Sequence, residues 1–386
     1  MTGISTRTGG AGSTGLSGLR VLDLSRVLAG PFAAMTLGDL GASVIKVEQS
    51  GRGDETRRWG PPFDARGESA YYLSINRNKL GIALDLTDRD DRALLRTLLR
   101  DADVVIENFL PIALERLGLS PEELLETHPQ LIWCTIGGFG ADPRRPGYDF
   151  AVQAESGWMS VNGEPDGEPL RGPVAIVDVL TGKDAVIAIM AALVQRGGAA
   201  LPAAARHVKI SLMQSAVAGL VNVAQNVLVS QAEAQRWGNG HPNIVPYQLF
   251  HARDGDVVIA VGTDSQWRAC TSVLGLTELS SDESLSTNAG RLAARGRVVG
   301  AMAAAVASIP AAGLIAELTA VGVPSGLVRS VGDAVAEVGG SPLTGIPPSV
   351  PGTVRLPPPR LDEHGEAIRA HGWSAFSNLA PAVNRV

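Results

Sequence analysis

The 386-residue sequence predicts an α/β protein with a parallel β-sheet and a second, smaller domain. Through about the first 215 residues, short runs rich in β-branched residues alternate with helical patterns, which is typical of parallel strands connected by helices. After about residue 235 the pattern changes to a turn, a strand and a group of helices, which indicates the second domain. The length is also sufficient for about two to three domains.

The composition excludes several other classes of protein. Apolar residues make up 45% of the chain and charged residues 19%, which argues against a disordered, fibrous or coiled-coil protein. The net charge of −6, without a cluster of Lys and Arg, argues against a nucleic-acid partner. The 45 glycines and 24 prolines indicate many turns, or loops that approach a ligand closely.

The sequence contains no sign of a disulfide framework, a zinc site or a membrane span. Cys134 and Cys270 lie in apolar surroundings and are expected to be buried, inert thiols. Residues 1–15 lack the layout of a signal peptide and are expected to form a flexible tail. The longest uncharged stretch, residues 298–316, is broken by Pro310 and fits two packed helices better than a membrane span. We therefore expect a soluble, cytoplasmic protein without a membrane partner.

The elements of the first domain follow from short apolar runs and from helical periodicity. Pro31 suits the first turn of a helix over residues 32–40, which Gly41 ends. Leucines repeat along residues 88–101 with the spacing of one buried helical stripe. Residues 181–195 are apolar on nearly every side, which predicts a central helix, and one long helix is expected over 213–231. The expected strands are residues 20–24, 43–48, 81–86, 103–107, 131–136 and 207–212.

The second domain is expected to begin with a turn at residues 254–256 and a strand over 257–261. A proline-rich tail that ends the chain is interpreted as an extended arm. The remaining elements expected are helices at about 264–274, 289–308 and 311–321, a strand at 326–329 and a helix from Val331.

The usual motifs of nucleotide-dependent and hydrolytic enzymes are absent. The sequence contains no G-x-G-x-x-G after its first strand, and no G-x-x-x-x-G-K-[ST], G-x-S-x-G or H-E-x-x-H. Hydride transfer on a dinucleotide, ATP-driven ligation, serine hydrolysis and zinc proteolysis are therefore disfavoured. The six histidines are scattered, and each alone is more often structural than catalytic.

Three segments are unusual on physical grounds. Residues 26–31 lead from a strand into a helix N-terminus, where free N–H groups bind anions, although an ordinary connection is equally consistent. Asp178 lies within the apolar run 174–180, just before a predicted helix, so its carboxylate needs a partner or a function, or it caps that helix. Gly238, Asn239 and Gly240 form a loop whose backbone can approach a ligand, or a simple interdomain turn.

Six segments in a fixed order carry a family resemblance. They are residues 16–54, 76–86 (NRNKLGIALDL), 103–119 (DVVIENFLPIALERLGL), 138–167, 177–193 (VDVLTGKDAVIAIMAAL) and 240–261 (GHPNIVPYQLFHARDGDVVIAV). Together they closely resemble the family III CoA transferases, which include the formyl-CoA, carnitine and bile-acid CoA transferases (CaiB/BaiF-like). The resemblance runs from about Leu16 to Val261, and more weakly to about Arg329.

The resemblance implies a Rossmann-like large domain and a smaller α/β domain in an interlocked homodimer. The large domain would comprise residues 16–224 together with 326–386, and the small domain residues 225–325. The implied activity is transfer of CoA from an acyl-CoA donor to a carboxylic acid acceptor. Coenzyme A thioesters would be the substrates, with no permanently bound cofactor and no metal.

The same resemblance assigns roles to individual residues. Asp178 matches the catalytic aspartate, which forms a mixed anhydride and then an aspartyl-CoA thioester. The loop of Gly238, Asn239 and Gly240 matches the family's glycine-rich loop over the aspartate. The positions that match CoA-binding residues are Val27, Leu28, Lys79, Asn108, Phe109 and Arg116. Independently of these matches, Arg26, Tyr148 and Gln153 are expected in the substrate pocket, and the charge of Arg26, where the family has another residue, is a candidate partner for the second carboxylate of a diacid.

Two alternatives remain. The α-methylacyl-CoA racemases share the implied fold, but their histidine falls at the position of Tyr148. A tyrosine with an ordinary pKa near 10 is a poor base at neutral pH, which favours the transferase. A non-enzymatic CoA-binding or scaffold protein is the second alternative, and it would make Asp178 dispensable.

Overall fold

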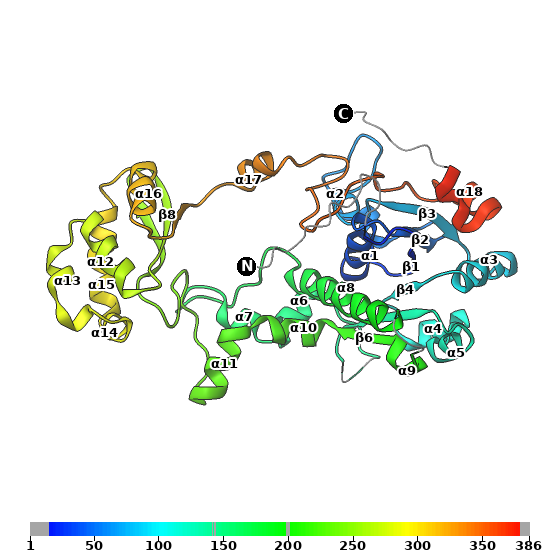
Figure 1. Ribbon diagram of the computed structural model, residues 1–386, viewed down its shortest axis with the longest axis horizontal. Helices are drawn as coiled ribbons and strands as arrows, with labels where there is room; N and C mark the ends of the chain where they lie inside the picture. The colour runs from blue at the N-terminus through cyan, green and yellow to red at the C-terminus, as the bar shows by residue number, and fades with distance from the viewer. Residues whose placement is uncertain (1–14, 141, 143, 198–200, 379–386) are drawn as a thin grey trace, which may run out of the picture. The chain divides into compact units, whose positions relative to one another are not determined.

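The computed structural model describes residues 15–140, 142, 144–197 and 201–378, which form two compact units. The first unit contains the described residues of 1–158, 171–231 and 338–386, and the second contains residues 159–170 and 232–337 (Figure 1). Residues 1–14 of the expected N-terminal tail lie outside the described residues.

A six-stranded, entirely parallel sheet forms the centre of the first unit (Figure 1). Its strand order is β3-β2-β1-β4-β5-β6, so the order reverses between β1 and β4. In doubly wound sheets of this kind ligands bind outside the carboxyl ends of the strands at that point. The strands are β1 (Arg20–Asp23), β2 (Ser43–Gln49), β3 (Lys79–Leu84), β4 (Val104–Glu107), β5 (Ile132–Gly137) and β6 (His207–Ser211).

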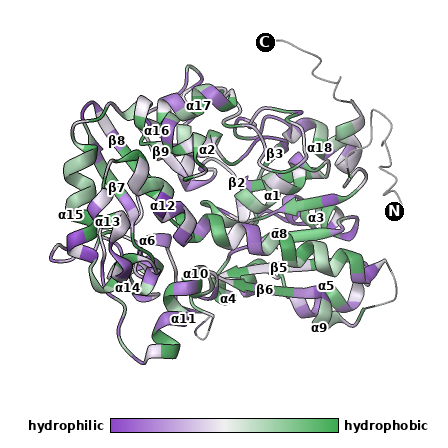
Figure 2. Cartoon of the chain, turned by 60° about the vertical axis from the view of Figure 1, so that its left-hand side comes forward, coloured by the Kyte–Doolittle hydropathy of each residue, from purple (hydrophilic) through white to green (hydrophobic). Residues whose placement is uncertain are grey.

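Helices cover both faces of this sheet because alternate strand residues point to opposite sides. One core joins residues such as Val21 and Val44 to α1 (Ala29–Asp39), α8 (Ile176–Arg196) and α10 (Leu212–Gly219). The other joins Leu22 and Ile45 to α3 (Arg89–Arg100), α4 (Pro111–Leu117), α5 (Pro121–Thr127), α18 (Gly365–His371) and η3 (Gly372–Asn378). Hydrophobic residues, green in Figure 2, accordingly run along the strands and along α8.

Local sequence determines where these helices begin and end. Asp88 caps α3 by accepting hydrogen bonds from the N–H groups of Asp90 and Asp91. Gly118 ends α4 in the left-handed conformation, with φ +65°. The shorter elements of this unit are η1 (Glu55–Arg58), α2 (Ala70–Leu73), α6 (Asp149–Glu155), α9 (Ala203–Arg206) and α11 (Val221–Ser230).

The single helix predicted over residues 213–231 is wrong: the chain bends by 74° between α10 and α11. Gly219 ends α10 against Trp158, and a Cβ at this position would lie 3.1 Å from Cζ2 of that tryptophan. Val221 then starts α11 with a positive φ of 38°. No residue of α11 is buried in the chain, although its sequence is mostly apolar.

The helix predicted over residues 181–195 also differs from the structure. α8 begins five residues earlier, at Ile176, so Asp178 lies inside its first turn. It is not central on every side, because Ile187 and Val194 are exposed.

The second unit contains a three-stranded antiparallel sheet, order β7-β8-β9, and a helical layer. Its core includes Trp267, Met302 and Leu314, which are fully or almost fully buried. The strands are β7 (Tyr247–Ala252), β8 (Gly255–Ala260) and β9 (Ser325–Leu327). The helices are α12 (Asp264–Val273), α13 (Thr277–Ser281), η2 (Glu283–Leu285), α14 (Asn288–Ala293), α15 (Arg295–Val306) and α16 (Ala311–Ala320).

Two differences from expectation concern this unit. The sequence patterns missed β7, and the helix expected over 289–308 is divided at Ala294 into α14 and α15. Two further helices, α7 (Trp158–Val161) and α17 (Val331–Val338), cross the boundaries between the two units along the chain.

The proline-rich segment after α17 returns to the first unit. Its backbone bonds to that unit, since the N–H of Asn78 donates to the carbonyl of Leu356 and the N–H of Thr353 to that of Asp39 (both 2.9 Å). Across the described ranges, no single helix has the length and apolarity needed to cross a membrane. Two bent pairs, α10 with α11 and α15 with α16, pass that test by length and composition only.

Candidate active site

The loop after β1 is held at the point where the strand order reverses. The side chain of Asn108, which follows β4, accepts a hydrogen bond from the N–H of Arg26 (2.9 Å) and donates one to its carbonyl (2.8 Å). This two-point contact fixes the backbone of Arg26. The amide of Asn108, which the sequence assigns to CoA, is thus occupied by this backbone, and Asn108 acts as a positioning residue.

The next residue, Val27, has a backbone conformation that is rare for a β-branched side chain. Its φ is +70°, and its N–H points toward Oδ1 of Asp54 at 3.4 Å. α1 then begins at Ala29, and Leu28 supplies no side-chain cap. Among the described residues, no acceptor contacts the N–H groups of Leu28 and Ala29, so this helix end can hold negative charge.

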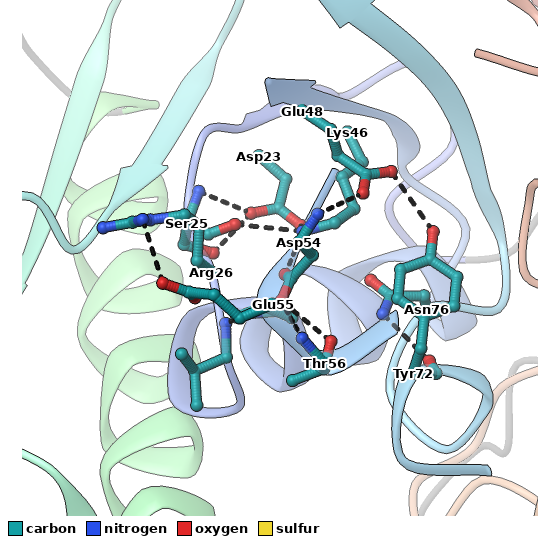
Figure 3. Close-up of polar contacts among 12 residues, drawn as sticks. Asp23, Ser25, Arg26, Lys46, Glu48, Asp54, Glu55, Thr56, Tyr72 and Asn76 are labelled. Carbon is teal, nitrogen blue, oxygen red and sulfur yellow. Dashed lines mark hydrogen bonds and ion pairs between the residues drawn. The ribbon is translucent and has the colours of Figure 1, made fainter. Parts of the chain in front are cut away.

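A buried group of charges lies beneath this loop (Figure 3). Nζ of Lys46 donates to the carbonyl of Ser25 (3.0 Å) and pairs with Asp54 (3.1 Å). Burial would raise the pKa of Asp23, but Lys79 and Lys46 outweigh burial and hold it below its usual value. The charges are therefore paired, and they fix the carbonyl positions of the loop.

Lys79 belongs to this buried group, which corrects its expected role as a CoA ligand. Its Nζ donates to Asp23 (2.9 Å), to Asn76 (2.8 Å) and to the carbonyl of Pro31 (2.8 Å), and the side chain is fully buried. Burial lowers its pKa to about 8, although Asp23 opposes that shift. The ammonium group is not accessible to a phosphate.

Asp178 is the third residue of α8 and only 7% exposed. Within the described part of the chain, no hydrogen bond reaches its carboxylate oxygens. Burial, and then the charge of Asp149, raise its pKa to about 7. The carboxylate is thus desolvated and without hydrogen bonds, which suits a nucleophile.

The cap of α8 comes from Asp149 and not from Asp178. Oδ1 of Asp149 accepts hydrogen bonds from the N–H groups of Val177 (2.8 Å) and Asp178 (3.2 Å). Gln153, fully buried, donates to Oδ2 of Asp149 (2.5 Å) and accepts from the N–H of Gly172 (2.8 Å). Gln153 therefore orients Asp149, which corrects the expectation that it lines the substrate pocket.

A cavity of about 180 Å³ brings most of the predicted site residues together. It lies within the first unit, and Asp178 and the N-terminus of α1 are both in its wall. The predicted residues that line it are Arg26, Val27, Leu28, Asn108, Phe109, Tyr148 and Asp178. Glu55 and Arg145 also line it, and the sequence patterns did not single out either one.

A second cavity, of about 360 Å³, lies outside the ends of β1 to β4. Arg26 and Phe109 line both cavities, and Arg116 lines only the second. Leu86 and Leu117 supply apolar surface beside that arginine. An apolar cavity with a few polar groups is the ordinary form of a small-molecule site.

Tyr71 is a further residue near Asp178 that the sequence patterns missed. Burial, and then the charges of Asp178 and Asp149, raise the pKa of its phenol well above 10. The tyrosine also packs edge-on against Trp59, with ring centroids 5.0 Å apart. Neither a motif nor a helical period distinguishes it in the sequence.

Gly238, Asn239 and Gly240 lie in the second unit. Gly238 has φ +54°, and its N–H donates to the carbonyl of Gly163 (3.1 Å). A Cβ at Gly238 would lie 2.7 Å from Oε2 of Glu164, which is the far end of a flexible side chain and can shift, so the positive φ is the reason that this turn favours glycine.

A family model, related proteins and a solved structure give consistent results when they are compared with this chain. Residues 16–340 match the family model described as CoA-transferase family III. The chain is 42% identical over 327 residues to succinyl-CoA:glutarate CoA-transferase of Mus musculus (83% of this chain, 74% of the relative). It is 46% identical over 286 residues to succinate--glutarate CoA-transferase of Agrobacterium fabrum (72% and 71%). The crystal structure of a CAIB/BAIF family protein from Brucella suis superposes with a TM-score of 0.78, at 39% identity (92% and 99%).

Proposed function

The chain belongs to CoA-transferase family III and transfers CoA between an acyl-CoA and a carboxylate, and we propose that Asp178 is its nucleophile. The observation that carries this role is the carboxylate of Asp178, buried in the cavity wall without a hydrogen bond from the described residues. Its pKa of about 7 leaves it partly ionised at neutral pH and more basic than an ordinary carboxylate.

The reaction begins when an oxygen of Asp178 attacks the thioester carbonyl of the donor. The new C–O bond gives a mixed anhydride, and the C–S bond breaks to release CoA thiolate. The thiolate then attacks the aspartyl carbonyl, which frees the donor's carboxylate and leaves an aspartyl-CoA thioester. The acceptor carboxylate attacks the carbonyl of this thioester, which forms a second mixed anhydride with Asp178 and breaks the C–S bond to release CoA thiolate. The thiolate then attacks the acceptor's carbonyl carbon, which gives the product acyl-CoA and frees the carboxylate of Asp178.

The N–H groups of Leu28 and Ala29 are the proposed donors to the oxyanion that forms in each step. They lie at the N-terminus of α1 in the wall of the same cavity as Asp178, and helix N-termini stabilise such charge. The strained backbone at Val27 sets their direction. The loop of Gly238, Asn239 and Gly240 is proposed to cover the anhydride and thioester, which water would otherwise hydrolyse.

The second cavity is the proposed site for the nucleotide end of CoA. It lies at the carboxyl ends of parallel strands, offers apolar surface for adenine and carries Arg116 for phosphate. Phe109 lines both cavities and therefore lies along the path of the pantetheine arm. We assign no direct CoA contact to Lys79, and we assign Asn108 to the backbone of Arg26.

The acceptor is proposed to be a dicarboxylate. Two relatives are named for transfer to or from glutarate. The wall of the cavity around Asp178 contains Arg26, whose guanidinium makes one hydrogen bond, to Glu55, with the described residues, so a second negative charge has a cation available beside the reacting carboxylate.

Trapping the covalent intermediates tests this proposal. The enzyme is incubated with succinyl-CoA and treated with hydroxylamine, and peptide mass spectrometry should show the hydroxamate on Asp178. Asp178→Ala should abolish CoA transfer to glutarate, while Asp166→Ala, at an exposed aspartate outside both cavities, should not. Full transfer by Asp178→Ala would contradict the assignment. Exchange of the α-proton of a 2-methylacyl-CoA in heavy water, without transfer, would favour the racemase.

We propose the remaining features from the family resemblance. They are a Rossmann-like large domain over residues 16–224 and 326–386, a small domain over 225–325, an interlocked homodimer and a cytoplasmic location. The strand order of the large sheet and the two compact units support the first two. The exposed apolar surface of α8 and α11 supports the homodimer.

A further inference from the structure

Arg26 occupies a junction in the candidate site. It lines the cavity that contains Asp178 and also the second cavity, and its side chain is 48% exposed. Asn108 fixes its backbone, and its guanidinium lies 5.5 Å from the ring centroid of Phe109. The guanidinium of Arg26 is therefore held at a defined position beside the two cavities, unlike that of a freely rotating surface arginine.

The guanidinium of Arg26 has unused hydrogen-bond donors. Nη1 contacts Oε1 of Glu55 at 3.2 Å, which Figure 3 shows as a single dashed line. Among the described residues, nothing accepts from Nε or Nη2. These two nitrogens form the edge of the guanidinium that can bind a carboxylate in a bidentate manner.

Arg145, the other arginine of the same cavity, is already satisfied. Both of its terminal nitrogens contact the carboxylate of Glu155, and its guanidinium stacks on Phe139 at 3.7 Å. A ligand would have to displace a bidentate ion pair to use it. Arg26 is consequently the cation with capacity for a second carboxylate.

Glu55 lowers the attraction of Arg26 for an anion without blocking its free edge. The residue begins η1, where Asp54 caps the turn by accepting from the N–H of Thr56. Its Oε2 is buried and accepts no hydrogen bond from the described residues. The pair is thus a single contact, and removal of the negative charge of Glu55 would leave Arg26 a net cation toward the cavity.

We propose that Arg26 is a specificity-determining residue that binds the distal carboxylate of a dicarboxylate acceptor, and that Glu55 sets the strength of this contact. The inference rests on the proposed function, because it places the other carboxylate at Asp178. A monocarboxylate of the same length would leave the free edge of Arg26 without a carboxylate partner. A site that is built to bind a polar group discriminates strongly against the analogue that lacks it.

The test compares kcat/KM for glutarate with that for pentanoate, which has the same chain length and one carboxylate fewer, with succinyl-CoA as donor. Arg26→Gln should lower the glutarate-to-pentanoate ratio by about ten-fold or more, and Arg26→Lys by less, because lysine keeps the charge but not the bidentate edge. Glu55→Gln should raise the glutarate-to-pentanoate ratio, because it removes the negative charge that competes for Arg26. Arg58→Gln, at an exposed arginine of the same η1 segment outside both cavities, is the matched control.

Several outcomes would overturn the proposal. One is a glutarate-to-pentanoate ratio that stays unchanged in Arg26→Gln. Another is a ratio that falls in Arg145→Gln instead of in Arg26→Gln. A KM for succinyl-CoA that rises equally with both acceptors would show that Arg26 binds a CoA phosphate. Circular dichroism melts identify variants that fail to fold. If Arg26→Gln fails to fold, Glu55→Gln still tests the role of Arg26, because it should raise the glutarate-to-pentanoate ratio. Absence of transfer to either acid by the unmodified enzyme would contradict the proposed function and not the role of Arg26.

Discussion

Asp178 and Asp149 belong to different helices, but hydrogen bonds couple them. Asp149 holds the N-terminus of α8 through the N–H groups of Val177 and Asp178, so its negative charge stays close to the nucleophile. The charge raises the pKa of Asp178 in addition to the effect of burial. One residue therefore both positions the nucleophile and increases its basicity.

This coupling predicts the acidic side of the pH profile. Asp178 attacks as a carboxylate, so kcat/KM should rise with pH through about 7, the pKa of that group. Asp149→Asn keeps an oxygen for the N–H of Val177 but removes the charge, so the rise should move to lower pH. The measurement is the pH dependence of kcat/KM for succinyl-CoA. Asp101→Asn, at an exposed carboxylate distant in sequence from both, should leave the profile in place; an unmoved profile in Asp149→Asn would show that its charge has no role.

The same shift has a consequence for stability. The pKa of Asp178 is about 7 in the folded chain against 3.8 as an ordinary value, so the folded state keeps a proton that the unfolded state loses between these pH values. Stability is therefore lost as pH rises through this window, by about 4 kcal/mol at most. Asp178→Asn, which cannot titrate, should be inactive yet more stable than the unmodified protein at pH 8.

Urea unfolding of both proteins at pH 4.5 and pH 8, at equal protein concentration, checks this expectation. The advantage of Asp178→Asn should be small at pH 4.5 and largest at pH 8. A constant difference at both pH values would mean that lost packing or hydrogen bonds explain it, and not the buried charge.

The geometry of the site depends on how closely α8 approaches α1. Gly182 lies one turn after Asp178 on the same face of α8. A Cβ at this position would lie 2.7 Å from the carbonyl oxygen of Ala29 and 2.9 Å from Cδ1 of Phe32. Glycine therefore allows Asp178 to share a cavity wall with the free N–H groups of α1.

Gly182→Ala should separate the two helices and move the nucleophile from its proposed oxyanion donors. Overpacking of this kind costs about 1–3 kcal/mol in stability, and kcat should fall more than the KM for the donor rises, because the second cavity is not altered. Gly313→Ala in α16, where a Cβ would meet nothing within 4 Å, is the matched control. It should be neutral or stabilising by up to about 1 kcal/mol. Unchanged turnover in Gly182→Ala would contradict the role of close packing.

The strands of the large sheet were predictable, because apolar runs and turn residues act locally, whereas the start of α8 was predicted five residues too late, after Asp178. The side-chain environments of Lys79 and Asn108 were not predictable. Whether the lysine that begins β3 points to a ligand or into a buried ion group depends on Asp23, 56 residues earlier. Asn108 bonds to a residue 82 positions away for the same reason. Only the strand order of the sheet, β3-β2-β1-β4, brings these pairs together.

The bend at Val221 was also beyond local prediction. The apolar pattern from residue 213 to 231 fits one helix; in the structure the bend follows Gly219, where a Cβ would lie 3.1 Å from Cζ2 of Trp158. The consequence of the bend is a largely apolar helix, α11, without a buried residue. Four of its ten residues are half-buried and six are exposed, so most of this helix lacks cover within the described part of the chain.

The exposed apolar residues of α8 and α11 require cover if the chain is to stay dispersed in water. Ile187 and Val194 on α8, and Leu228 and Val229 on α11, are all at least 66% exposed. Exposed apolar patches of this kind mark interaction sites, and a second copy of the chain is the partner implied by the family resemblance. We therefore expect a homodimer, of twice the 40.1 kDa chain mass, by light scattering.

An interlocked dimer differs from an ordinary one in how its subunits exchange. Subunits threaded through each other cannot separate while folded, so a mixture of two differently tagged forms should contain no mixed dimers after days at 25 °C. The mixed species should form once both are unfolded in urea and refolded together. Leu228→Glu should lower the yield of dimer on refolding, because it introduces a charge into the covered face. A monomer would contradict the assembly altogether, and mixed dimers forming without denaturant would show that two ordinary surfaces meet instead of two threaded chains.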